Sequence, residues 1–379
     1  MRRISSIFTA SSDSTMPKYI YQYPNWPQFT WDDKGINALF GEVKWLQGKL
    51  IGQMNSLGFS MKEEASLTTL TLDIVKSSEI EGEILNYNQV RSSLALRLGI
   101  NTSGIVPSSR HIDGIVSMML DATQGFAKPL THERLYGWHA ALFPTGFSGP
   151  YAIAVAQYRQ GEMQIVSGAM GKEKIHYEAI PTKDVFDAMN TFLTWYNQEQ
   201  QLDPVLKAAI AHFWFIIIHP FDDGNGRIGR ALTDMLLAKA ENNGERFYSM
   251  SNQILVERQA YYAILQQVQH SSGDITPWLI WFLTCLKNAL LSTETTTAAI
   301  LRKATFWQRH EHTEINERQR LMLNKLLDGF EGKLKTSKWA KITKVSPDTA
   351  LRDIKNLIEK GILRESQDGG RNAAYELIS

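Results

Sequence analysis

Cysteine is almost missing from this sequence of 379 residues, because Cys285 is the only one. One cysteine excludes an internal disulfide and a zinc site built from several thiolates, and its place in an apolar run favours a buried, inert thiol. An excess of one charge is also lacking, since 40 basic residues face 39 acidic ones. A net charge of +1 argues against wholesale nucleic-acid wrapping and against a polybasic membrane anchor. The longest apolar run, Phe213–Ile218, is far shorter than a membrane span. We therefore expect a cytoplasmic protein with no membrane partner.

The chain is long enough for two to three domains at about 150 residues each. Its patterns predict a disordered leader over 1–16, an N-terminal helical domain over 17–105, a central helical domain over 106–300 and a C-terminal domain over 301–379. Apolar periodicity predicts mainly α structure. The helices expected to matter most for function are Asn37–Leu57, Lys62–Ile80, Pro204–Ile218 and Arg227–Asn242. One small β-hairpin is expected within Tyr158–Pro181, where Gly161, Gly168 and Gly171 act as breakers.

The last sixty residues change in character. Three short helices are predicted at Glu317–Leu327, Ser337–Thr343 and Pro347–Lys360, followed by two strands around the turn Asp368-Gly369-Gly370. Three helices and a hairpin in this order predict a winged helix-turn-helix. Thr349, Arg352 and Lys355 would face outward on its third helix. DNA binding and packing against protein are both open for this module.

Residues 219–230 hold most of the chemistry, in the order His-Pro-Phe-Asp-Asp-Gly-Asn-Gly-Arg-Ile-Gly-Arg. Pro220 cannot continue the buried helix before it, so His219 lies at the end of that helix. A glycine-rich turn that leads into a helix presents several N–H groups in one direction, which suits an anion. Arg227 and Arg230 project from the same helix face. Asp223 is a natural ligand for Mg²⁺ on phosphates, which needs only one or two carboxylates.

This combination indicates phosphoryl or nucleotidyl transfer with a histidine general base. Each part alone could be structural, as a turn, a buried histidine or a solvated helix face. The whole segment resembles the Fic family motif, His-Pro-Phe-x-(Asp/Glu)-Gly-Asn-Gly-Arg-x-x-Arg, at every fixed position. The resemblance extends over roughly Ser108–Leu291 and implies a Fic-type helical core that transfers AMP from ATP to a hydroxyl of a target protein, with release of pyrophosphate.

By this resemblance, His219 is the general base and Asp223 holds Mg²⁺. The implied ATP-binding residues are Gly224, Asn225, Gly226, Arg227, Ile228, Gly229, Arg230, Ile175, Tyr261, Tyr262 and Gln269. The hairpin within Tyr158–Pro181 resembles the family's flap, along which a target protein would bind by strand addition. A plain connector is the other interpretation of the hairpin.

A second short pattern lies before the core. Leu70, Ile74, Ser77 and Glu81 share one face at helical spacing, which would bury a carboxylate among apolar residues. Alternatively, Glu81 lies beyond the helix end and is solvated, like its neighbours Glu79 and Glu83. Ser77–Gly82 resembles the inhibitory pattern (Ser/Thr)-x-x-x-Glu-(Gly/Asn) of class II Fic proteins. That resemblance implies autoinhibition, with Glu81 paired to Arg230.

Alternatives remain open for the function as a whole. The Fic core could act on another nucleotide or remove AMP, or the chain could be a DNA-binding regulator whose core senses nucleotide. An intact His219 argues against pure sensing, which needs no general base. The segment Tyr23–Trp31 resembles the start of a domain often found before bacterial Fic cores, for which supporting the inhibitory helix or forming a homodimer are the roles considered.

Overall fold

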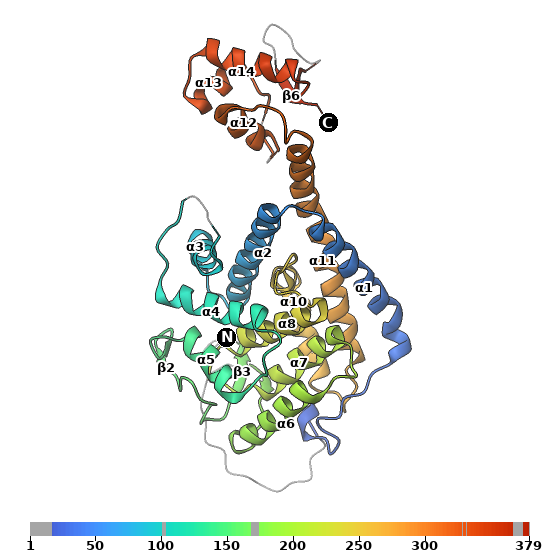
Figure 1. The fold of residues 1–379 in the computed structure, drawn as a ribbon. Helices are drawn as coiled ribbons and strands as arrows, with labels where there is room; N and C mark the ends of the chain where they lie inside the picture. The colour runs from blue at the N-terminus through green and yellow to red at the C-terminus, as the bar shows by residue number, and fades with distance from the viewer. Residues whose placement is uncertain are drawn as a thin grey trace. The chain divides into compact units, whose positions relative to one another are not determined.

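The computed structural model of the protein describes residues 17–100, 104–167, 174–327, 329–330, 332–366 and 374–378. The leader expected over 1–16 and the turns expected near Gly168 and at 368–370 lie outside these residues. The chain divides into two compact units, Met1–Thr293 and Glu294–Ser379. Both are mainly helical, as predicted, with small two-stranded hairpins (Figure 1). Among the described residues, no helix is both long and apolar enough to cross a membrane.

In the described part of the first unit, one 3₁₀ turn, η1 (Ile20–Gln22), and three helices come first. These helices are α1 (Asp33–Asn55), α2 (Phe59–Ile80) and α3 (Tyr87–Leu98). Eight further helices follow, from α4 to α11, together with η2 (Thr182–Asp184). Their bounds are α4 (Arg110–Gln124), α5 (His132–Leu142), α6 (Val185–Gln198), α7 (Pro204–Ile218), α8 (Asn225–Glu241), α9 (Met250–Val256), α10 (Arg258–Val268) and α11 (Thr276–Arg309), the last of which runs past the boundary between the units.

Two antiparallel hairpins interrupt the helices of this unit. The first, β1 (Phe147–Ser148) and β2 (Tyr151–Ala152), is too short to show periodicity and was not expected from the sequence. The second, β3 (Gln164–Ser167) and β4 (Lys174–Glu178), lies within the predicted hairpin segment and has a register shift between Ile165 and Val166.

Helix α7 is the central helix of the first unit. It has the range expected from the sequence, because Asp203 caps it by accepting from the Val205 N–H at 2.8 Å and Pro204 suits its first turn. Nearly all of its residues are buried, as its apolar composition on every face requires. It packs most extensively against α8, so the turn between these two helices is held on both sides by the core.

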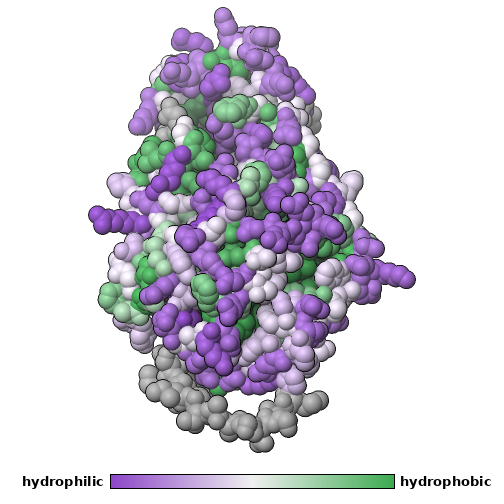
Figure 2. Space-filling view, turned by 60° about the horizontal axis from the view of Figure 1, so that its bottom comes forward, coloured by the Kyte–Doolittle hydropathy of each residue, from purple (hydrophilic) through white to green (hydrophobic). Residues whose placement is uncertain are grey.

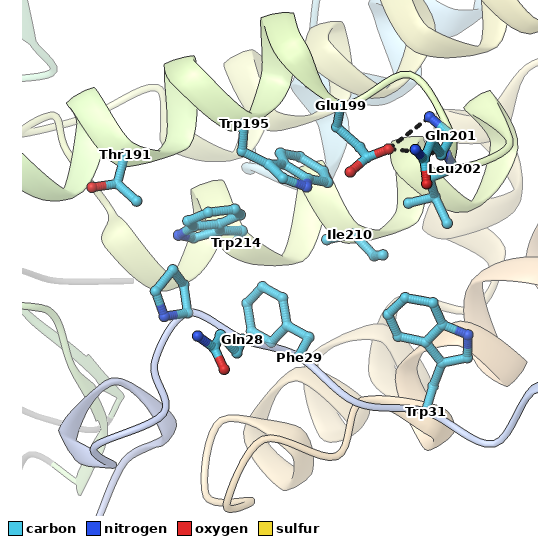
Figure 3. Close-up of a pocket in the computed structure, with 11 residues that line it drawn as sticks. Gln28, Phe29, Trp31, Thr191, Trp195, Glu199, Gln201, Leu202, Ile210 and Trp214 are labelled. Carbon is cyan, nitrogen blue, oxygen red and sulfur yellow. Dashed lines mark hydrogen bonds between the residues drawn. The ribbon is translucent and has the colours of Figure 1, made fainter.

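The aromatic N-terminal arm packs against the outer side of α6 and α7. Trp26 and Phe29 meet the Trp214 ring edge to face, at 6.1 and 5.6 Å between centroids. A groove of about 570 Å³ remains between the arm and these helices (Figure 3). Trp31, Trp195 and Trp214 line it, but none of residues 219–230 does. The arm is thus a packing element placed away from the turn after α7.

The second unit has its own core. Helices α12 (Glu317–Leu327), α13 (Thr336–Thr343) and α14 (Pro347–Glu359) are followed by the antiparallel strands β5 (Leu363–Glu365) and β6 (Tyr375–Leu377). Trp339, Ile354 and Leu357 are fully buried between them. Arg352 and Lys355 are exposed on α14, as expected, whereas Thr349 is half-buried.

Hydrophilic and hydrophobic side chains are mixed on the face of the molecule that Figure 2 shows. Hydrophilic residues spread over most of it, and hydrophobic ones form small separate groups. This distribution is typical of a protein surface in water, where isolated apolar side chains need no special explanation. Cys285 is fully buried, as predicted.

Candidate active site

The turn between α7 and α8 brings the chemistry-bearing residues together. His219 ends α7 in a left-handed conformation with φ of +50°, and Gly224 with φ of +81° begins α8. The side chain of Asn225 closes the turn, because its Oδ1 accepts from the Phe221 N–H at 2.9 Å and its Nδ2 donates to the Phe221 carbonyl at 2.7 Å. These bonds use Oδ1 and one N–H of the Asn225 amide. The backbone N–H groups at the start of α8 form a part of this turn that suits an anion.

Arg159 fixes the turn from outside, and no pattern in the sequence points to this role. This side chain is 1% exposed. Its Nε donates to the His219 carbonyl at 2.9 Å, and its backbone N–H donates to the Pro220 carbonyl at 2.8 Å. Its guanidinium also donates to the carbonyls of Gly161 and Ile180, near the two ends of the β3–β4 hairpin. Arg159 thereby ties the hairpin to the backbone that carries His219.

The orientation of the His219 ring defines its tautomer. Nδ1 lies 3.3 Å from the Ile216 carbonyl, which can only accept, so Nδ1 carries the hydrogen. In the neutral tautomer with its hydrogen on Nδ1, Nε2 has the lone pair. A backbone contact that selects this tautomer is the arrangement that general base catalysis needs.

Asp223 lies beside His219 in the same turn. Its Oδ1 accepts from the Gly224 N–H at 2.7 Å, and its Oδ2 accepts from the hydroxyl of Ser148, on the unexpected β1–β2 hairpin. In the part of the chain that the structure describes, no three His, Cys, Asp or Glu side chains gather into a metal cage. One carboxylate fits Mg²⁺ that is shared with phosphate oxygens, because this ion keeps waters and uses few protein ligands there.

His139 supports the turn from α5. Its ring stacks on Phe221 at 4.4 Å between centroids. Its Nδ1 accepts from the Ala156 N–H and its Nε2 donates to the Asp223 carbonyl, each at 3.2 Å. Burial lowers the pKa of His139 to about 4, so the ring is neutral at physiological pH and has one donor and one acceptor nitrogen. The sequence analysis did not single it out.

Arg230 is 1% exposed and bound to the end of α2. Its Nε donates to the Ser77 hydroxyl at 2.8 Å, and its Nη2 donates to the Ser77 carbonyl at 2.8 Å and to Glu81 Oε1 at 2.9 Å. Burial disfavours its charge, but Glu81 and nearby tyrosines outweigh burial, and the pKa of Arg230 is raised. Gly226 makes this pairing possible, since a Cβ there would overlap the Glu81 carboxylate. Glu81 thus contacts the first turns of α8 and is not simply solvated.

Arg227 has a carboxylate partner too. Its Nη1 donates to Glu83 Oε2 at 2.9 Å, and its guanidinium lies 5.1 Å from the centre of the Phe143 ring. Glu83 also contacts Nε2 of His111. From the sequence alone, Glu83 is only a charged neighbour of Glu81. Each arginine of the turn therefore meets a carboxylate from the segment that follows α2.

The implied ATP-binding residues outside the turn differ in burial and in distance along the chain. Tyr261 is buried and bonded to His212 at 2.9 Å, and Tyr262 packs beside it at 5.1 Å between ring centres. Both tyrosines lie within electrostatic reach of Arg230. Gln269 donates to the His176 carbonyl of β4 at 2.9 Å, and Ile175 on that strand is 43% exposed.

Two residues of the turn contribute to packing. The side chain of Ile228 is fully buried in the core. At Gly229, a Cβ would lie only 3.2 Å from the Ile216 side chain, so this glycine lets α8 approach α7 closely.

Comparison with known proteins gives two matches to family models. Residues 129–237 match the Fic/DOC family, and residues 19–100 match a domain of unknown function, DUF4172. The chain is 34% identical over 245 residues to the protein adenylyltransferase Fic of Nematostella vectensis, which covers 63% of this chain and 51% of that protein. It is 37% identical over 220 residues to the protein of the same name from Drosophila mojavensis, covering 57% and 40%. It thus spans about half or less of the length of these curated relatives.

Two solved structures share the fold. A Fic family protein from Desulfovibrio desulfuricans G20 has a TM-score of 0.56 at 20% identity, covering 93% of this chain and 98% of that one. A Fic domain containing signaling protein from Bacteroides thetaiotaomicron has a TM-score of 0.50 at 22% identity, covering 72% and 97%. The chain therefore carries a domain of the Fic/DOC family at residues 129–237, preceded by a DUF4172 domain at residues 19–100.

Proposed function

We propose that this chain is a protein adenylyltransferase that transfers AMP from ATP to a Ser, Thr or Tyr hydroxyl of a target protein and of itself, and that Glu81 inhibits it. One observation carries the proposal. The buried guanidinium of Arg230, next to the start of α8, holds the Glu81 carboxylate at 2.9 Å. An anion at that place fits a site built for phosphates, and its origin in the chain itself fits a built-in inhibitor.

In the proposed reaction, the target hydroxyl attacks the α-phosphate of ATP. Nε2 of His219 takes the hydroxyl proton, the new P–O bond forms to the target oxygen, and the bond to pyrophosphate breaks. The N–H groups at the start of α8 stabilise charge on the phosphate oxygens. Asp223 would hold Mg²⁺, which neutralises phosphate charge when bound. Arg230 binds the terminal phosphate only after Glu81 has left it.

The β3–β4 hairpin is suited to hold the target. Gln269 and Arg159 bind carbonyls at His176 and Ile180, so the hairpin is anchored to the helical core next to His219. An extended target segment could add to the edge of this hairpin through main-chain hydrogen bonds, which demand little of its sequence. Such binding would bring a hydroxyl towards Nε2 of His219.

For the second unit, we infer a winged helix-turn-helix. The order of three helices and an antiparallel hairpin supports this assignment. Exposed Arg352 and Lys355 lie on α14, where a recognition helix would contact DNA. A gel-shift assay with the full chain and the Arg352→Ala variant tests DNA binding, and unchanged mobility of DNA would leave packing as the role of this unit.

Intact-mass measurement tests the proposed activity. Purified wild type, Glu81→Gly and His219→Ala are incubated with ATP and Mg²⁺, and the mass of each is followed over time. We expect one AMP group per modified site, fastest in Glu81→Gly and absent in His219→Ala. A gain in the His219→Ala variant would contradict the role of the base. Equal rates in wild type and Glu81→Gly would contradict inhibition by Glu81.

A further inference from the structure

The turn that ends α2 aims two carboxylates at one target. Gly82 has φ of +87°, and the N–H groups of Gly82 and Glu83 donate to the carbonyls of Glu79 and Ser78, each at 3.0 Å. These two bonds form a Schellman motif, which fixes the backbone direction after the helix. As a result, Glu81 and Glu83 both reach α8, on either side of the glycine.

Glu83 binds Arg227 in a largely buried setting. The side chain of Arg227 is 7% exposed and that of Glu83 is 34% exposed. Burial acts to raise the pKa of Glu83, but the His111 contact and the charge of Arg227 outweigh it, so the pKa lies below its usual value and the carboxylate is ionised at neutral pH. The Nε of Arg227 is buried without a hydrogen-bond partner among the described residues. This guanidinium therefore has donor capacity that Glu83 alone does not use.

His111 holds Glu83 in this position. Its Nε2 contacts Glu83 Oε1, and its Nδ1 lies 3.1 Å from the Leu142 carbonyl at the end of α5. The two oxygens of Glu83 are thus divided between α4 and α8, which orients the carboxylate toward Arg227. A merely solvated glutamate would have neither contact.

We propose that Glu83 is a second inhibitory carboxylate, which occupies Arg227 while Glu81 occupies Arg230. This inference rests on the proposed function, in which Arg230 binds the terminal phosphate, and on the ATP-binding role that the family resemblance implies for Arg227. It extends inhibition from one ion pair to two pairs carried by one turn. Removal of Glu81 alone then leaves Arg227 paired, and the nucleotide still meets a carboxylate in its site. Full phosphate binding needs both carboxylates to be displaced.

Nucleotide affinity tests the proposal directly. The Kd of ATP with Mg²⁺ is measured by calorimetry on the full chain, with His219→Ala in every variant so that no transfer occurs. The series is the parent, Glu81→Gly, Glu83→Gln and the double variant. Glu79→Gln is the matched control, because Glu79 lies on the same last turn of α2 and pairs with Lys76 at 2.8 Å.

We expect the double variant to bind ATP about tenfold more tightly than Glu81→Gly, because a charge beside the phosphates is removed. Glu79→Gln should bind like the parent. A His111→Asn variant, which releases Glu83 without removing its charge, should give a smaller gain. Thermal unfolding shows whether each variant remains folded, and glutamine at residue 83 keeps the shape of the native side chain.

Two results would overturn the second carboxylate as an inhibitor. One is equal affinity of Glu81→Gly and the double variant, and the other is weaker binding by the double variant, which would make Glu83 a residue that positions Arg227 for phosphate. Failure of the proposed function can be told apart from failure of the Glu83 proposal. Suppose that Glu81→Gly with intact His219 transfers AMP, while the double variant binds ATP no more tightly than Glu81→Gly. This outcome rejects only the role of Glu83. Tighter ATP binding without transfer in any variant rejects only the transferase.

Discussion

Replacing Ser77 by alanine tests how firmly α2 is attached to α8. Ser77 is 3% exposed, and its hydroxyl accepts from Nε of Arg230 at 2.8 Å. Alanine leaves this buried, charged donor without an acceptor, and such a loss costs about 2 kcal/mol of unfolding free energy. The bond from Arg230 to the Ser77 carbonyl belongs to the backbone and remains. The expected loss of unfolding free energy is therefore well below the loss that a fully unpaired buried charge would cause.

The neighbouring serine is the matched control. Ser78 is fully buried, and its hydroxyl has no hydrogen-bond partner among the described residues. Removing a buried hydroxyl that makes no bond has little cost, because its desolvation is no longer required. Ser78→Ala should thus be neutral or slightly stabilising, although it lies in the same turn and is at least as buried as Ser77.

Urea unfolding measures both variants, with the unfolding free energy taken from the midpoint and slope. The rate of AMP gain is measured alongside, and Ser77→Ala should lie between wild type and Glu81→Gly, because Arg230 loses one of its bonds to α2. Equal destabilisation by the two alanine variants would refute the reasoning. So would a rate in Ser77→Ala indistinguishable from that of wild type.

Three further outcomes are expected. Gly82→Ala should lower the unfolding free energy by about 1 kcal/mol in urea, from backbone strain alone, because φ is +87° and no atom lies within 4 Å of the added carbon. Asp73→Ala should cost about 3 kcal/mol, since it leaves the buried Ser251 N–H without its acceptor, whereas Asp73→Asn keeps an acceptor and should cost clearly less. Burial lowers the pKa of His212 from 6.5 to about 3, so the unfolded chain binds more protons than the folded chain between these pH values. The unfolding free energy therefore falls as pH falls through that range. Unfolding measured across this pH range should show a shallower loss of unfolding free energy in His212→Gln.

The helices around the site could be predicted from the sequence because their signals are local. Asp203, Pro204 and Pro220 mark both ends of α7, and the structure confirms that range. The position of His219 follows from the same signals. The end of α2 was equally readable, since Gly82 favours a left-handed turn after the helix.

The residues that support the site could not be predicted, because their contacts join distant parts of the chain. Arg159 binds the His219 carbonyl 60 residues away, and Glu83 binds Arg227 over 144 residues. Ser148, which contacts Asp223, lies on a two-residue strand that has no measurable periodicity. The two bonds between the Asn225 amide and the backbone of Phe221 are likewise visible only in the folded turn.

The anchoring of α2 bears on how the proposed inhibition by Glu81 would be released. Asp73 is buried and accepts from Ser251 on α9, eight residues and about 12 Å before Glu81 along the helix. That upstream segment is held by the core, whereas Glu81 and Gly82 follow the last residue of the helix and are exposed. In the proposed function, relief of inhibition would therefore break the Glu81–Arg230 pair by a local opening of one turn, without displacement of α2 as a body. Local openings of this kind take microseconds to seconds, so the proposed inhibited state would be left and restored without unfolding of the rest of the chain.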